Sequence, residues 1–77
     1  MIKEAEIVVL TRDIPDCKLK IGDIGTVVHR YKEEIAFEVE FVNAEGGTMA
    51  VLTLDKDSIR PITSKEILHV RPFELVA

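Results

Sequence analysis

Cysteine is nearly absent from this sequence, which has a single one, Cys17, among its 77 residues. One thiol cannot form an internal disulfide, and no cluster of cysteines and histidines predicts a structural zinc site. A chain of this length buries only about 60% of the surface that its unfolded form exposes, so it depends on a dense apolar core. Hydrophobic residues make up 47% of the sequence, which supplies such a core and excludes a disordered chain.

Long apolar runs and clusters of positive charge are also missing. No stretch approaches the roughly 18 apolar residues of a membrane-spanning helix, and the first residues lack the pattern of a signal peptide. We therefore expect a cytoplasmic protein that contacts no membrane. The formal net charge is -4 and the cations are scattered singly, which argues against nucleic acid as a partner.

Short β-rich segments separated by turn residues fill most of the chain. The clearest pattern is at residues 37–41, where Phe37, Val39 and Phe41 alternate with two glutamates at a strict period of two. This alternation predicts a strand with the three apolar side chains facing the core. Similar enrichment in β-branched and aliphatic residues predicts four further strands, at 7–10, 26–31, 48–54 and 59–62.

The segments between these strands have the composition of turns. Residues 11–25 predict a long loop held to the core by Ile14, Leu19, Ile21 and Ile24, and residues 43–47 predict a hairpin with a glycine turn. Five short strands are too few for an ordinary sandwich but enough for a small barrel. We therefore predict an all-β fold, a small five-stranded barrel, for residues 1–62.

Residues 63–77 carry too many apolar side chains for a free tail, so we predict an arm that packs on the barrel or on a partner chain. Its conformation is open between two alternatives. Residues 63–66 (Thr-Ser-Lys-Glu) match a capping box, which favours a short helix. The β-branched residues that follow, and Pro72, favour extended geometry around residues 66–71, as a strand, which is the reading we prefer.

The order of these elements resembles an SH3-like barrel of the KOW-related kind. Residues 22–27 (Gly-Asp-Ile-Gly-Thr-Val) are similar to the diverging turn of that superfamily. More closely, residues 8–15, 22–28, 38–42 and 67–71 together resemble a bacterial domain-of-unknown-function family of short stand-alone proteins. The resemblance spans residues 6–71 and implies the SH3-like fold, but it implies no catalytic or binding residue.

Few residues are candidates for chemistry. Glu38 and Glu40 share one strand face at a separation of about 7 Å, which suits acid and base roles, but such alternation is typical of any solvated strand face. The aspartates of the loops are better explained as turn formers than as cation ligands. Cys17, His29 and His69 come from distant parts of the chain and predict no zinc site. We therefore expect no enzyme, no catalytic residue, no metal, no cofactor and no small-molecule substrate.

The apolar arm favours a non-enzymatic protein-interaction module. The partner is either a second copy, in a homodimer, or another protein, in which case the chain is an antitoxin-like or immunity-like partner. The candidate partner-binding residues are all on the arm: Ile67, Leu68, Val70, Phe73 and Leu75.

The alternative function is an RNA- or ribosome-associated KOW-like barrel. It would use Arg30, Tyr31 and Lys32, which place an aromatic ring between two cations. One short repeat is explained by neither function: the pattern Arg-Pro-apolar occurs at residues 60–62 and again at 71–73. The repeat marks either two equivalent docking edges or a coincidence.

Overall fold

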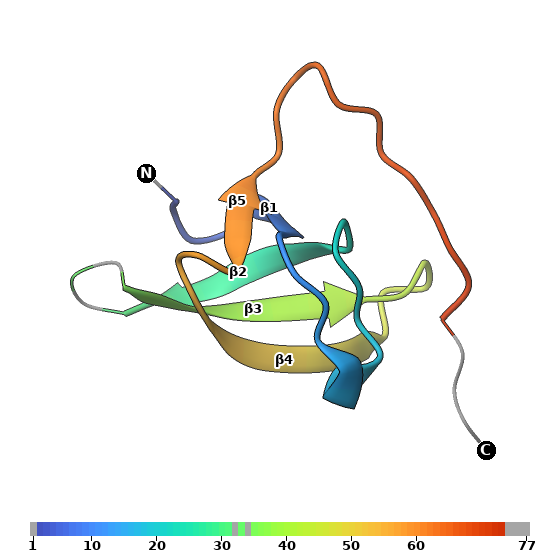
Figure 1. Ribbon diagram of the computed structural model, residues 1–77, viewed down its shortest axis with the longest axis horizontal. Helices are drawn as coiled ribbons and strands as arrows, with labels where there is room; N and C mark the ends of the chain where they lie inside the picture. The colour runs from blue at the N-terminus through green and yellow to red at the C-terminus, as the bar shows by residue number, and fades with distance from the viewer. Residues whose placement is uncertain (1, 32, 34, 74–77) are drawn as a thin grey trace.

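The structure is a computed structural model that describes residues 2–31, 33 and 35–73. The described residues form one antiparallel sheet of five strands in the order β4-β3-β2-β1-β5 (Figure 1). The predicted all-β fold is confirmed. The elements are β1 (Ile7–Leu10), the 3-10 helix η1 (Pro15–Cys17), β2 (Ile24–Arg30), β3 (Ala36–Val42), β4 (Thr48–Asp55) and β5 (Ile59–Pro61).

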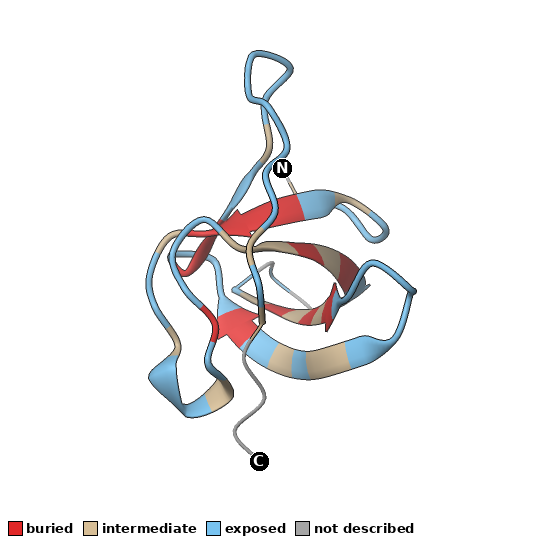
Figure 2. Cartoon of the chain, turned by 90° about the vertical axis from the view of Figure 1, so that its right-hand side faces the viewer, coloured by how far each residue is buried: buried red, intermediate tan, exposed pale blue. Residues whose placement is uncertain are grey.

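β3 contributes three large side chains to the buried core. Phe37, Val39 and Phe41 are 2%, 0% and 3% exposed, which confirms the alternation predicted for this strand. The buried residues are concentrated on the strands (Figure 2). The other buried core side chains come from every remaining strand and from the loop before β2: Val8, Leu10, Leu19, Val27, Leu54 and Ile59.

The turn between β3 and β4 is built by an asparagine and a glycine. The Asn43 carboxamide oxygen accepts hydrogen bonds from the backbone N–H groups of Glu45 and Gly47, at 3.0 and 2.9 Å. Gly46 has φ +84°, a conformation that a side chain would strain. The predicted hairpin is therefore confirmed, and it fixes the register between β3 and β4.

The long loop between β1 and β2 is attached to the core more locally than the sequence suggested. Leu19 is buried and forms an isolated bridge with Ile14, which is partly buried. Ile21 is 64% exposed, so its predicted role as an anchor is wrong. Ile24 lies within β2, which begins two residues before the predicted start because Gly25 is a strand residue and not a turn residue.

The sheet does not close into a complete barrel. Its outer strands in the described part of the chain are β4 and β5, which do not pair with each other. β5 is only three residues long and ends at Pro61, which has no N–H to donate to a ladder. The expected closure therefore fails where the chain leaves the sheet to form the arm. None of the helical turns among the described residues has the length and apolar character to cross a membrane.

The described part of the arm, residues 63–73, forms neither of the two predicted elements. After one turn at residues 64–65, it runs as irregular extended chain back along the sheet. The capping-box contact itself exists, since the Glu66 carboxylate accepts a hydrogen bond from the Thr63 N–H at 2.8 Å. No helix follows because β-branched residues and Pro72 come next and because Arg60 also binds the Glu66 carboxylate.

Candidate interaction surface

Two ion pairs attach the arm to the body of the protein. In the first, the Arg60 guanidinium at β5 donates two hydrogen bonds to the Glu66 carboxylate, at 2.8 and 2.6 Å. The hydrogen bond from Arg60, assisted by the Thr63 N–H, lowers the pKa of Glu66 from 4.5 to about 2. This contact closes a short loop at the start of the arm.

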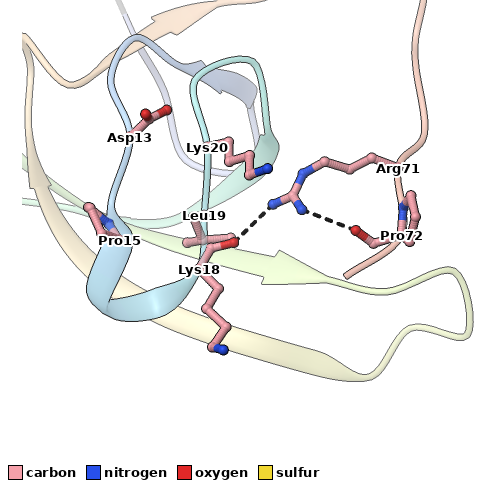
Figure 3. Close-up of a pocket in the computed structure, with 7 residues that line it drawn as sticks. All are labelled: Asp13, Pro15, Lys18, Leu19, Lys20, Arg71 and Pro72. Atoms are coloured by element: carbon pink, nitrogen blue, oxygen red, sulfur yellow. Dashed lines mark hydrogen bonds between the residues drawn. The ribbon is translucent and has the colours of Figure 1, made fainter. Parts of the chain in front are cut away.

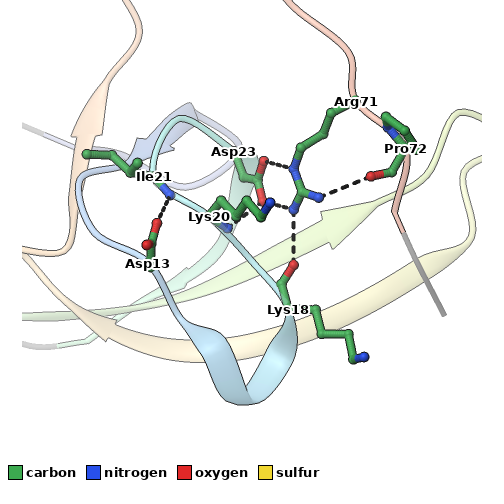
Figure 4. A network of polar contacts seen from close by, with 7 residues as sticks. All are labelled: Asp13, Lys18, Lys20, Ile21, Asp23, Arg71 and Pro72. Carbon is green, nitrogen blue, oxygen red and sulfur yellow. Dashed lines mark hydrogen bonds and ion pairs between the residues drawn. The ribbon is translucent and has the colours of Figure 1, made fainter. Parts of the chain in front are cut away.

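The second ion pair joins the far end of the arm to the turn before β2 (Figure 4). Arg71 donates from Nε and Nη2 to the two carboxylate oxygens of Asp23, at 2.7 and 2.5 Å, and from Nη2 to the Lys18 carbonyl at 3.0 Å. The side chains of Arg71 and Asp23 are 30% and 17% exposed, so water screens this pair less than an ordinary surface pair.

The turn that contains Asp23 holds its carboxylate in place to accept the hydrogen bonds from Arg71. Its carboxylate also accepts a hydrogen bond from the Lys20 N–H at 2.8 Å. Partial burial raises the pKa of Asp23, but the hydrogen bonds from Arg71 and from the Lys20 backbone outweigh it, so the pKa lies below the usual aspartate value. Asp23 is therefore a preorganised acceptor for the guanidinium.

The repeated Arg-Pro sequence corresponds to these two anchors. In each copy the arginine Nη1 donates to the carbonyl oxygen of the following proline at 3.1 Å. Arg60 binds its carboxylate through Nη1 and Nη2, whereas Arg71 binds through Nε and Nη2. The two arginines thus share the contact with the following proline carbonyl and the same kind of partner, a carboxylate. The repeat was the one sequence signal for the anchors, although it did not reveal Glu66 or Asp23 as the acceptors.

Large aliphatic side chains lie in solvent between the two anchors. Ile67, Leu68 and Val70 are 90%, 64% and 89% exposed, and the arm is exposed along most of its traced length (Figure 2). Phe73 alone among the described candidates packs against the core, with its ring 5.9 Å from the Arg71 guanidinium carbon. Within the described part of the chain, the sheet therefore does not cover the first three side chains, whereas Phe73 packs against the core. Leu75 lies outside the described residues.

Two open clefts flank the second anchor, and Arg71 lines both. The smaller, of about 510 Å³, lies against η1, and its charged lining includes Asp13, Lys18 and Lys20 (Figure 3). The larger, of about 790 Å³, runs between the arm and the β3–β4 hairpin. Its apolar lining includes Ile21, Phe41, Val42, Met49 and Val70. Val70 belongs both to the exposed arm and to the lining of the larger cleft, and we call Ile67, Leu68, Val70 and this cleft together the arm surface.

The residues of the nucleic-acid alternative lie elsewhere, at the end of β2. Tyr31 is 39% exposed, and its ring meets the His29 ring edge-on, with 4.7 Å between centroids. The His29 Nδ1 is 3.6 Å from a carboxylate oxygen of Glu4. Arg30 ends the strand, and Lys32 lies outside the described residues. The acidic side chain of Glu4 thus lies beside His29, which contacts the tyrosine, and a negative charge there is unfavourable for binding a phosphate backbone.

The remaining chemical candidates have structural partners. Glu38 and Glu40 accept hydrogen bonds from the hydroxyls of Thr53 and Thr48 on the neighbouring strand. The Asp13 carboxylate accepts from the Ile21 N–H at 2.8 Å. Within the described ranges, no three histidine, cysteine, aspartate or glutamate side chains gather in a group that would hold a metal ion.

Comparison with known proteins places the chain in a family without assigning it an activity. Residues 4–61 match the family described as a domain of unknown function, DUF4926, and the chain belongs to that family. The match covers the sheet and ends where the arm begins. No curated protein and no solved structure matches the chain. The predicted membership of a family of unknown function is confirmed, and its bacterial and SH3-like details stay predictions.

Proposed function

We propose that this DUF4926 protein is a non-enzymatic interaction module that binds another protein through its arm surface. The observation that carries the proposal is the exposure of Ile67, Leu68 and Val70 on a segment tied down at both ends. Exposed aliphatic side chains that cluster on one surface are typical of protein-binding sites. Because the anchors already restrict the backbone, a partner would lose less entropy in ordering it than in ordering a free tail.

The extended backbone adds a second means of recognition. No strand pairs with residues 67–70 in the described part of the chain, so their peptide groups are available to the edge of another sheet. The formal charge of -4 favours a basic partner by steering its approach, as for an antitoxin-like or immunity-like protein that covers a basic effector. The proposal includes the sequence-based expectation of a cytoplasmic location.

The experiment compares three full-length tagged proteins expressed in the native host: wild type, the double variant Ile67→Glu/Val70→Glu, and a control, Val28→Glu. Val28 is 46% exposed on β2, so the control adds a charge at an exposed aliphatic position away from the arm. We expect a partner, identified by mass spectrometry, to be retained by wild type and control and lost by the arm variant. Identical sets of retained proteins for all three would contradict the proposal.

RNA binding through Arg30, Tyr31 and Lys32 is the less well supported alternative. It predicts that single-stranded RNA binds at low salt and that the Ile67→Glu/Val70→Glu variant binds as well as wild type. A flat titration with wild type would exclude it.

A further inference from the structure

The outer edge of β4 is a second surface without a partner in this chain. β4 pairs with β3 from Ala36 opposite Asp55 to Val42 opposite Thr48. On its other side no strand pairs with it in the described part of the chain, because the sheet ends there. A row of backbone N–H and C=O groups is therefore presented to solvent along this edge.

Apart from a register shift near Thr48, this edge lacks the features that normally prevent strands from pairing between molecules. Residues 46–54 form the longest uncharged run in a chain that is 31% charged, and β4 occupies residues 48–54 of that run. It has no lysine on the edge, no proline and no inward-pointing charge, and its register shift is confined to the end near Thr48. The opposite edge, β5, has both Arg60 and Pro61 among its three residues. Only β5 is protected by its composition.

The side chains of β4 alternate in a way that another strand of the same pattern would continue. Ala50 and Leu52 face the core and are partly buried, whereas Val51 and Thr53 face outward and are exposed. The core is thus incompletely covered at this edge. A strand added here has to present small and aliphatic residues inward and uncharged residues outward, which is the pattern of β4 itself.

We propose that β4 binds β4 of a second copy, antiparallel and across a twofold axis at Val51. In this register Val51 lies opposite its symmetry mate and Ala50 lies opposite the partner's Leu52, so that at the centre of the pair inward positions meet inward positions. The register leaves Asp55 beyond the paired segment, and no charged side chains face each other. The two five-stranded sheets become one continuous sheet, and one patch serves both molecules.

The acidic character of the chain does not oppose this pairing. The nearest carboxylate, Glu40, lies on β3 beside Val51. Glu40 and its symmetry mate are separated by three strand spacings, roughly 14 Å at 4.7–4.9 Å each. That separation exceeds the Debye length of about 8 Å at physiological salt, so repulsion between them is largely screened. This proposal does not rest on the exposed arm residues Ile67, Leu68 and Val70; the two surfaces meet at Met49, which lies on β4 and lines the larger cleft.

The oligomeric state of the full chain, measured by sedimentation over a range of concentrations, is the first test. We expect a dimer for wild type and a dissociation constant raised by about tenfold for both Val51→Lys and Val51→Glu, since each places like charges opposite each other. An equimolar mixture of the two variants should recover the dimer, because unlike charges then face each other. Val51 is half exposed, so neither variant should disturb folding.

A disulfide trap tests the register. In a Cys17→Ser background, Val51→Cys should cross-link to its mate under mild oxidation, because directly opposite residues have Cα atoms about 4.5–5.5 Å apart, within disulfide range. Val28→Cys in the same background is the control and should not cross-link.

A monomeric wild type at several hundred micromolar, a dimer unchanged in Val51→Lys, or a dimer broken only by Ile67→Glu/Val70→Glu would overturn the proposal. The last result would indicate exchanged arms instead.

Discussion

Arginine, and not lysine, suits both anchor positions of the arm. A guanidinium presents a planar fork that matches the two oxygens of a carboxylate, whereas an ammonium group acts as a point charge. Arg60 and Arg71 each use this fork and still donate to the adjacent proline carbonyl. One side chain therefore fixes both the local chain direction and a contact with another segment.

The Arg60 anchor leads to a prediction about acid titration. Glu66 should titrate with a pKa of about 2 in wild type and nearer to 4.5 in Arg60→Gln, because the hydrogen bond from Arg60 is the largest cause of the shift. Side-chain carboxyl shifts in NMR measure both values. Arg60→Lys, which keeps the charge without the fork, should give an intermediate pKa.

The direction of this pH effect follows from the depressed pKa. Above pH 4.5 Glu66 is ionised in both the folded and the unfolded chain, and the contact contributes fully. Its contribution declines as the pH falls from 4.5 towards about 2 and is absent below that. A Glu66 pKa of about 2 in Arg60→Gln would show that Arg60 is not the cause.

At the scale of the elements, Gly25 shows how closely β2 packs on the face of β3. A Cβ atom at Gly25 would lie 2.5 Å from Val39 Cγ1 and 2.9 Å from Phe41 Cε2. Both distances are well below van der Waals contact. Glycine is therefore needed at position 25 because a side chain would collide with Val39 and Phe41, and not because the backbone has a positive φ.

We expect Gly25→Ala to destabilise the protein by about 1–3 kcal/mol, because an extra methyl group overpacks a filled core. Urea unfolding measures the loss, and the slope of the transition should stay unchanged. Val39→Ala removes one of the clashing atoms, so Gly25→Ala/Val39→Ala should lose less than the sum of the single losses. Strict additivity of the two would mean that the Cβ atom is accommodated in another way.

Gly25 also shows where the sequence was informative about the elements. The alternation at Phe37, Val39 and Phe41 is a local property of the chain, so β3 was predicted correctly. Gly25 was predicted as a turn residue because residues 22–25 have the composition of a turn. The contact with Val39, which explains why a glycine is needed there, joins residues that are remote in sequence. Strand positions could therefore be predicted, but the exact start of β2 could not.

The candidate site was predictable only in part for the same reason. The apolar character of Ile67, Leu68 and Val70 is visible in the sequence, whereas their exposure depends on where the arm is attached. Arg71 and its acceptor Asp23 are 48 residues apart, and a pattern in the sequence cannot predict a contact between residues so far apart. The failure of the sheet to close likewise depends on the path that the chain takes after Pro61.

At the scale of the whole molecule, the protein consists of a folded sheet and an arm that touches it mainly at its two ends. The sheet holds nearly all of the buried apolar side chains, and the described arm adds Phe73. The β4 edge and the arm surface meet at Met49, whereas the exposed arm residues Ile67, Leu68 and Val70 lie outside β4. The Arg71 anchor decides whether the arm surface is assembled, because it brings the arm beside the larger cleft.

Loss of this anchor should release the arm without unfolding the sheet. In Arg71→Gln we expect the backbone of residues 67–70 to gain fast motion, seen as lower heteronuclear NOE values in NMR. The pair is partly exposed, so its loss should cost about 1 kcal/mol, which corresponds to a fall of roughly 4–8 °C in the thermal midpoint of a domain of this size. Arg60→Gln is the matched control: it removes the first anchor and should leave Phe73 in place. A much larger fall in the midpoint for Arg71→Gln would show that the arm is an integral part of the folded core, and unchanged NOE values would show that Arg71 does not hold it.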